Sequence, residues 1–338
     1  MTTRTQSPKR RGTLILIVAA LVLFFAAALA LDLANHGLAW RIFWSLTGEE
    51  TPVAQVRGMV EWLGNFTRTQ PNTAPYVPVQ HAEVNPYGIN TFLQQEVELS
   101  KREQQVQMIA EAGFHWIRQQ FPWEDIEIHG RGDFEDRRNV EAVGVLDAWA
   151  KYDHIVDLTE QYGLEIQARL DTPPRWTRGD QEVPGLAPPD NWDDYINFIT
   201  VVAERYQGRI HHYQIWNEPN IYPEWGSSAI NPEEYTDVLC RAYAALKAID
   251  PQIVVISAAL SPTLALSSRD LSDLIFLQRM YNAGAKDCFD VLAVQGYGFF
   301  SGPTDQRLRP FTLNFARPQY LRDTMVANGD AAKPVWIS

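Results

Sequence analysis

The chain has 338 residues, of which 46% are hydrophobic and 21% are charged, and its formal net charge is −12. This composition is too apolar for an intrinsically disordered protein. The acidic balance argues against a nucleic-acid partner, because phosphate binding needs a basic face. The two cysteines, Cys240 and Cys288, form no CxxC motif and no cluster with histidine, so the sequence predicts neither a metal site nor a cofactor. Whether these two cysteines pair is left open.

The first predicted element is a membrane-spanning helix over residues 12–32. Residues 14–31 carry no charge, whereas Lys9, Arg10 and Arg11 precede the run and Asp32 follows it. At about 1.5 Å per residue, 20 helical residues span roughly 30 Å, which is the thickness of the bilayer core. The basic flank places residues 1–11 in the cytoplasm as a short tail. We therefore expect an anchored protein whose remaining chain is extracytoplasmic.

This apolar run has two other interpretations. A buried helix of a soluble protein would carry polar interruptions, which this run lacks. A cleaved signal peptide has an apolar core of about 7–15 residues, shorter than this one, but Ala28-Leu29-Ala30 fits a cleavage site. Cleavage there would make the protein secreted and would also export the rest of the chain.

Residues 33–86 are predicted to be a juxtamembrane segment followed by a linker. Trp40 and Trp44 are expected at the outer membrane interface, and residues 52–66 have a helical apolar period. Residues 65–86 are rich in proline and small polar residues, a composition typical of an extended linker.

From Tyr87 onward, strand-like and helix-like segments alternate. The predicted strands are 88–90, 115–121, 164–170, 212–216, 253–257, 289–295 and 334–338, and the predicted helices are 97–112, 147–162, 192–206, 232–249, 270–283 and 315–328. Strands separated by helices form a parallel sheet. Asn231-Pro232 is a helix-start signal, and Gly113, Gly163 and Gly208 stand where left-handed C-caps are expected.

The fold class predicted for residues 87–338 is α/β, a (β/α)₈ TIM barrel lacking its last strand and helices. A complete barrel of this type has about 250 residues. The alternative is an open doubly wound sheet, which usually binds a nucleotide through a glycine-rich first turn. The first predicted strand is followed by no such turn, so the barrel is favoured.

In a parallel barrel, functional residues collect at the carboxyl ends of the strands. These ends carry Asp171, Asn217 and Glu218, and the loops that follow them carry Trp176 and Trp225. Polar groups beside flat aromatic rings suit a sugar, which has hydroxyl edges and apolar faces. We expect Asp171 to bind a substrate hydroxyl or to pair with Arg118 or Arg175, and Trp176 and Trp225 to contact substrate.

The segment Ile215-Trp216-Asn217-Glu218-Pro219-Asn220 resembles the acid/base motif of the retaining glycoside hydrolases of clan A, in particular families 5 and 39, the cellulase-like and β-xylosidase-like groups. The resemblance implies that Glu218 is the general acid/base and that Asn217 holds the sugar 2-hydroxyl. It also implies that Arg118 steadies the nucleophile and that Tyr297 hydrogen-bonds it.

In the family that the sequence resembles, the nucleophile is a glutamate at the end of strand seven, in a context like K-P-[VI]-W-[IV]-[ST]-E. This sequence ends Lys333-Pro334-Val335-Trp336-Ile337-Ser338, one residue before that glutamate is expected. We therefore expect the chain to be a fragment, inactive alone, of an enzyme that cleaves a β-linked glycan or oligosaccharide by a retaining double displacement. Asp171 is a less favoured nucleophile, because its strand neighbours that of Glu218.

Two rival functions share these features. An inactive carbohydrate-binding barrel at the cell surface would keep the aromatic rim but lack one carboxyl. A transglycosylase would use the same residues and pass the intermediate to a sugar instead of to water.

Overall fold

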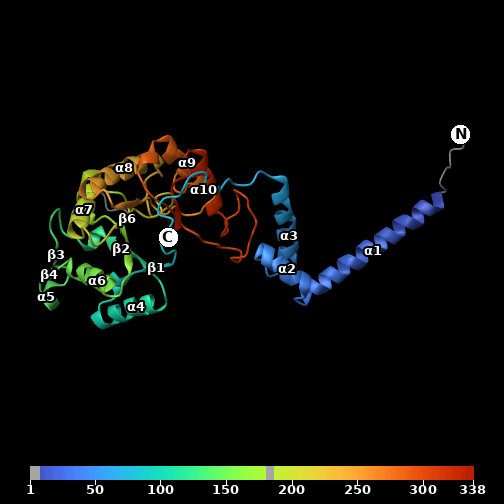
Figure 1. The fold of residues 1–338 in the computed structure, drawn as a ribbon, viewed down its shortest axis with the longest axis horizontal. Coiled ribbons are helices and arrows are strands. Elements are labelled where there is room, and N and C mark those ends of the chain that lie inside the picture. The colour runs from blue at the N-terminus through green and yellow to red at the C-terminus, as the bar shows by residue number, and fades with distance from the viewer. Residues whose placement is uncertain (1–7, 180–185) are drawn as a thin grey trace. The chain divides into compact units, whose positions relative to one another are not determined.

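The computed structural model describes residues 8–179 and 186–338. The chain divides into two compact units (Figure 1). The N-terminal unit holds the residues up to Gln70 together with Tyr297–Arg317, and the sheet unit holds Pro71–Gly296 together with Pro318–Ser338.

The sheet unit is an α/β structure built on parallel strands, and the seven predicted strands are confirmed. Five form one sheet in the order β1-β2-β5-β6-β7, and the last two pair with each other. Single parallel bridges, Ile256 to Val291 and Leu260 to Val294, connect the region of β7 to that of β8. The strands are β1 (Gly88–Thr91), β2 (Trp116–Pro122), β5 (Glu165–Asp171), β6 (His212–Ile215), β7 (Val254–Ile256), β8 (Leu292–Val294) and β9 (Val335–Ile337).

The six predicted helices are also confirmed, and they surround the strands (Figure 1). They are α4 (Leu99–Glu111), α6 (Ala150–Gln161), α7 (Trp192–Arg205), α8 (Pro232–Ile249), α9 (Asp273–Asn282) and α10 (Pro318–Ala327). At the start of α8, the Asn231 side chain accepts the Glu234 backbone N–H at 3.1 Å, as N-cap residues do. Gly113, Gly163 and Gly208 have φ of +84°, +68° and +76°, the left-handed backbone that favours glycine after a helix.

Shorter elements complete the chain. A small antiparallel ribbon, β3 (Glu135–Asp136) and β4 (Leu146–Asp147), flanks the one-turn helix α5 (Val140–Val143). The 3₁₀ turns are Gly64–Thr67, Leu93–Gln95, Trp123–Asp125, Arg175–Thr177 and Ala285–Asp287.

The strands bury side chains on both faces, as period-2 alternation in a parallel sheet requires. On the helix side, Ile117, Leu170 and Ile215 pack in one large apolar core with Tyr152 and Phe198. On the other side, a smaller core contains Val254, Ile256, Ala259, Val291 and Ala293, with Trp336 packed against it. The second core is therefore formed by the strands themselves.

The sheet curls, so that the last strand, β9, faces β2, β5 and β6. The Trp336 ring on β9 lies 5.5 Å from the Trp116 ring on β2 and stacks at 5.6 Å on His212 of β6. The Gln167 Nε2 on β5 donates to Ser338 Oγ at 3.2 Å. A cavity of about 440 Å³ remains, lined by β1, β9 and residues 81–86.

The segment predicted to be an extended linker differs from this expectation, because much of it packs on the sheet unit. The Asn72 backbone N–H donates to the Asp323 carboxylate at 2.8 Å, and that of Gln80 to the Ala332 carbonyl at 2.8 Å. The Trp116 indole N–H donates to the Asn85 carbonyl at 2.8 Å. The prolines prevent regular structure here, but the amides and carbonyls between them still find partners on the sheet unit.

The N-terminal unit contains α1 (Pro8–Ala34), α2 (Leu38–Thr47) and α3 (Pro52–Leu63). Within the described residues, Gly12–Ala34 is one helix long and apolar enough to cross a membrane by length and composition. A second correction concerns the loop Tyr297–Arg317, which was expected within the barrel and groups with these helices instead. The buried Arg307 explains this, since its guanidinium binds Asp305, Glu49 and Glu61.

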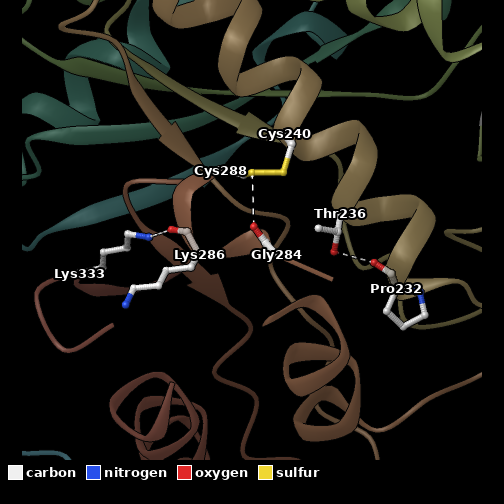
Figure 2. Close-up of a disulfide and its surroundings, with 7 residues drawn as sticks. All are labelled: Pro232, Thr236, Cys240, Gly284, Lys286, Cys288 and Lys333. Atoms are coloured by element: carbon white, nitrogen blue, oxygen red, sulfur yellow. Dashed lines mark hydrogen bonds between the residues drawn. A yellow bond between two sulfur atoms is a disulfide. The ribbon is translucent and has the colours of Figure 1, made fainter. Parts of the chain in front are cut away.

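Cys240 on α8 and Cys288, in the turn before β8, form a disulfide (Figure 2), which answers the question that the sequence left open. Disulfides persist in oxidising compartments. Together with the apolar N-terminal helix, this bond indicates an extracytoplasmic location.

Candidate active site

The predicted polar residues gather where β2, β5 and β6 end. Two residues here, Thr172 after β5 and Trp216 after β6, have left-handed backbones with φ of +61° and +71°. Such conformations cost about 1–3 kcal/mol and cluster at functional sites. At Trp216 the chain leaves the sheet, and Asn217 and Glu218 follow immediately.

Glu218 is half-buried and held by two neighbouring strands. Its carboxyl accepts hydrogen bonds from the side chains of Ser261, after β7, and Gln295, after β8. Burial raises the pKa of this carboxyl, and the Ser261 hydrogen bond and the charges of Arg118 and Arg169 oppose part of that increase. A carboxyl with a raised pKa keeps its proton closer to neutral pH, as a general acid must.

Asn217 is buried and is fixed by Arg118. The Arg118 Nη2 donates to Asn217 Oδ1 at 3.0 Å, and its Nε donates to Gln214 Oε1 at 2.8 Å. The third guanidinium nitrogen, Nη1, donates to Asn90 Oδ1 on β1 at 3.0 Å. One arginine on β2 therefore binds side chains on β1 and β6 and orients the amide that precedes Glu218.

Glu224 belongs to the same cluster and was not predicted from the sequence. Its half-buried carboxyl accepts a hydrogen bond from the Asn217 side chain, and its carbonyl accepts the Trp216 indole N–H at 3.0 Å. Burial, followed by the charges of Asp171 and Glu218, raises the pKa of Glu224 to about 7. Because Asn217 Oδ1 faces Arg118, it is the amide nitrogen that donates to Glu224. No motif or spacing in the sequence indicated this residue.

Asp171 lies buried in the same cluster, and its oxygens are occupied by protein groups. Arg169 Nε is 2.7 Å from Asp171 Oδ2, so the arginine that pairs with it is on its own strand. Gln120 Nε2 and Thr172 Oγ1 donate to Oδ1 at 2.8 and 2.6 Å. Arg169 could have been found from the sequence, because residues two apart on a strand share a face.

A cavity of about 400 Å³ is lined in part by Gln120 and Thr172, the two residues that donate to Asp171. Glu124, Asp125, Arg138 and Lys151 also line it. Burial and the neighbouring Asp125 raise the pKa of Glu124. These donors and acceptors suit a ligand rich in hydroxyl groups.

The aromatic residues that were predicted to contact substrate or the nucleophile lie in three different settings. The predicted substrate contact of Trp225 is wrong. The residue is only 1% exposed, and its ring packs against those of Trp192 and Trp216 at 5.7 Å, so it presents no face to a ligand. Trp176 is half-buried, with its ring edge-on to Trp123 and its indole N–H on the Glu127 carbonyl at 2.8 Å. Tyr297 falls in the segment grouped with the N-terminal unit and lies 5.6 Å from Phe299, so its hydrogen bond to a nucleophile stays a prediction.

Within residues 8–179 and 186–338, no group of three or more His, Cys, Asp or Glu side chains is placed to hold a metal ion.

Comparison with solved structures shows the fold. A family 39 glycoside hydrolase from Bacteroides cellulosilyticus matches 75% of this chain over 48% of its own, with a TM-score of 0.51 and 17% identity. A family 39 β-xylosidase from Caulobacter crescentus matches 80% of this chain over 54% of its own, with a TM-score of 0.53 and 15% identity. The chain spans about half the length of these proteins. The resemblance to clan A glycoside hydrolases is thereby confirmed for the fold. No family model and no curated protein matches the sequence.

Proposed function

We propose that the protein is a retaining glycoside hydrolase that cleaves a β-linked glycan or oligosaccharide outside the cytoplasm, with Glu218 as general acid/base. The observation that carries this proposal is the setting of the Glu218 carboxyl, half-buried at the ends of parallel strands, hydrogen-bonded by Ser261 and Gln295 and with a raised pKa. The fold shared with family 39 enzymes supports it.

The nucleophile is proposed to be a glutamate that follows Ser338 in the full-length protein. The register of β8 and β9 pairs Val294 with Ile337, and the Ser338 N–H donates to the Val294 carbonyl at 3.0 Å. This pairing brings Ser338 level with Gln295, whose side chain binds Glu218. The next residue along β9 would therefore reach the same rim as Glu218. Retaining enzymes need two carboxyls about 5–5.5 Å apart.

The reaction then has two balanced steps. In the first, the nucleophile carboxylate forms a bond to the anomeric carbon while the bond to the leaving oxygen breaks, and Glu218 gives that oxygen its proton. In the second, the Glu218 carboxylate takes a proton from water, whose oxygen attacks the anomeric carbon and releases the nucleophile. Asn217, oriented by Arg118 and Glu224, is proposed to hold the sugar 2-hydroxyl.

The protein is further proposed to stay in the membrane through residues 12–32, with residues 1–11 in the cytoplasm. The length and hydropathy of the helix Gly12–Ala34 support a retained anchor. Its substrate would then be a carbohydrate near the outer membrane surface.

The stereochemical outcome tests the mechanism. Full-length protein is assayed on a panel of aryl β-glycosides, and the anomer of the first-formed sugar is read by NMR. We expect the β-anomer, and we expect Glu218→Ala with azide to yield a β-glycosyl azide. An α-product, or loss of activity that azide never restores in a folded variant, would contradict the proposal.

A further inference from the structure

The helix α3 carries an apolar stripe that faces away from the other helices of the N-terminal unit. Val53, Val56, Val60 and Leu63 recur at intervals of three and four residues, which places them on one helix face. These four side chains, which we call the α3 stripe, are between 44% and 83% exposed. Single exposed apolar residues are ordinary, but a contiguous exposed patch marks an interaction surface.

The opposite face of α3 is already occupied, so the stripe is not an unfilled part of this unit's core. The buried Gln55 Nε2 donates to the carbonyls of Trp40 and Glu49 at 3.1 and 2.9 Å. A Cβ at Gly58 would lie 2.9 Å from Thr47, so α2 and α3 approach closely there. Residues on this face hold α3 against α2 and leave the α3 stripe outward.

The start of α2, the partner of α3, is joined directly to the end of the apolar helix α1. Three residues separate α1 from α2, and the Asp32 carboxylate accepts the Trp40 N–H at 3.1 Å while the Asp32 carbonyl accepts the Gly37 N–H at 2.9 Å. Leu33, at the end of α1, is buried. These contacts fix the start of α2 to the end of α1. Where α1 spans a bilayer, α2 and α3 therefore begin at its outer surface.

Two further features of α2 and α3 are typical of a membrane interface. The rings of Trp40 and Trp44 stack at 6.1 Å, and tryptophan is enriched at the level of the lipid headgroups. Arg57, next to Val56, has a side chain that is 81% exposed and pairs with Glu61 at 3.3 Å. Exposed pairs of this kind are weak, so the guanidinium can exchange Glu61 for a lipid phosphate. The apolar face thus lies beside an exposed arginine.

We propose that α3 lies in the outer membrane interface, with the α3 stripe in contact with the lipid of the bilayer. Helices of this kind bury their apolar face about 5–10 Å into the boundary between headgroups and acyl chains. The inference rests on α1 remaining in the membrane, as in the proposed function. The loop Tyr297–Arg317 binds α3 through the ion pair of Arg307 with Glu61, so this loop is held at the membrane surface as well.

The test places an environment-sensitive fluorophore on the stripe of full-length protein reconstituted in phosphatidylcholine–phosphatidylglycerol vesicles. Because Cys240 and Cys288 are paired, a new cysteine is labelled selectively. Val60→Cys is the test position and Val53→Cys a second one, while Val140→Cys on α5 of the sheet unit is the matched exposed control. Circular dichroism verifies that each variant folds.

We expect labels at positions 60 and 53 to emit at shorter wavelength and to lose most of their emission to nitroxide-labelled lipids but little to aqueous iodide. The label at position 140 should behave in the opposite way. Stripe labels quenched by iodide alone would overturn the proposal, because the stripe would then face water. Labels shielded from both quenchers would overturn it too, because the stripe would be covered by protein. Protein that loses α1 and leaves the vesicles would also contradict it. None of these readouts depends on glycosidase activity, so the proposed function can fail separately.

Discussion

The Arg118 guanidinium donates to Asn217 Oδ1 at 3.0 Å, and this contact determines which way the buried amide points. The amide nitrogen of Asn217 is left to donate to the Glu224 carboxyl, which stands near Asp171 and Glu218. Three carboxyls and two arginines, Arg118 and Arg169, therefore interact around one asparagine. Close like charges favour the protonated form of one member, and here burial and these charges act most strongly on Glu224.

Replacing Glu224 should change how stability depends on pH. The pKa of Glu224 rises from its ordinary value of 4.5 to about 7 in the folded protein, so the folded state binds this proton more tightly than the unfolded state does. The resulting stabilisation is fully present below pH 4.5 and is lost as the pH rises through 7. Over that window the free energy of unfolding should fall by up to about 3 kcal/mol through this group.

The measurement is urea denaturation of wild type and Glu224→Gln at pH 5 and pH 8 in detergent. The glutamine variant should gain stability relative to wild type as the pH rises, and Glu141→Gln, which removes an exposed carboxyl, should not. If the free energy of unfolding varied with pH in the same way in wild type and Glu224→Gln, the pKa of Glu224 would not be raised by folding, and the prediction would be wrong.

The disulfide should stabilise the sheet unit. Cys240 and Cys288 are 48 residues apart, and closing a loop of this length restricts the unfolded chain by about 4 kcal/mol in the chain-entropy model. The double variant Cys240→Ser/Cys288→Ser should therefore unfold at lower urea concentration, and reductant should affect wild type but not the variant. A wild-type protein indifferent to reductant, with two free thiols by mass spectrometry, would contradict the pairing.

Arg307 should be essential to the N-terminal unit. It binds Asp305, Glu49 and Glu61 with a side chain that is only 9% exposed. Removing one partner of a buried ionic cluster costs about 3–5 kcal/mol, so Arg307→Ala should release the loop Tyr297–Arg317 to proteolysis. Arg57→Ala is the matched control, because exposed Arg57 pairs with the same Glu61 and should cost less than about 1 kcal/mol. Equal protease resistance in both variants would refute the cluster's importance.

Trp225 should contribute to stability and little to substrate affinity. Its ring is enclosed by Trp192, Trp216 and Tyr235, and truncating a buried tryptophan costs about 3–5 kcal/mol. Trp225→Ala should lower the melting temperature strongly, whereas Trp225→Phe should retain most of the packing. A raised KM in Trp225→Ala with an unchanged melting temperature would restore the role of sugar platform that the sequence predicted.

The regular elements of the sheet unit were predictable because local signals and tertiary packing agree there. The strand predicted at 212–216 lies between Gly208 and the Asn217-Glu218 motif, and the structure places β6 there. The helix α8 begins after the Asn231 cap that its sequence predicts. The loop Tyr297–Arg317 was not predictable as part of the N-terminal unit, because its grouping depends on Arg307 meeting Glu49 and Glu61, more than 240 residues away in sequence. No local period records such a contact.

The candidate site was predictable only where a motif or a strand end marked it. Asp171, Asn217 and Glu218 lie together at strand ends, and Arg118 reaches Asn217 from within β2. Glu224 was not predictable because it lies in an irregular loop. The loop returns to Asn217 only through the Trp216–Glu224 hydrogen bond. Trp225 was misassigned because loop position alone does not reveal that a ring turns inward.

The general acid role of Glu218 is tested most directly by comparing wild type with Glu218→Gln in full-length protein on aryl β-glycosides that differ only in leaving-group pKa. General acid catalysis contributes about 10²–10⁴-fold where the leaving group needs a proton. We expect Glu218→Gln to lose a factor of this size on poor leaving groups and to lose little in the glycosylation step with dinitrophenyl glycosides. Wild-type rates on poor leaving groups in the Glu218→Gln variant would contradict this role of Glu218.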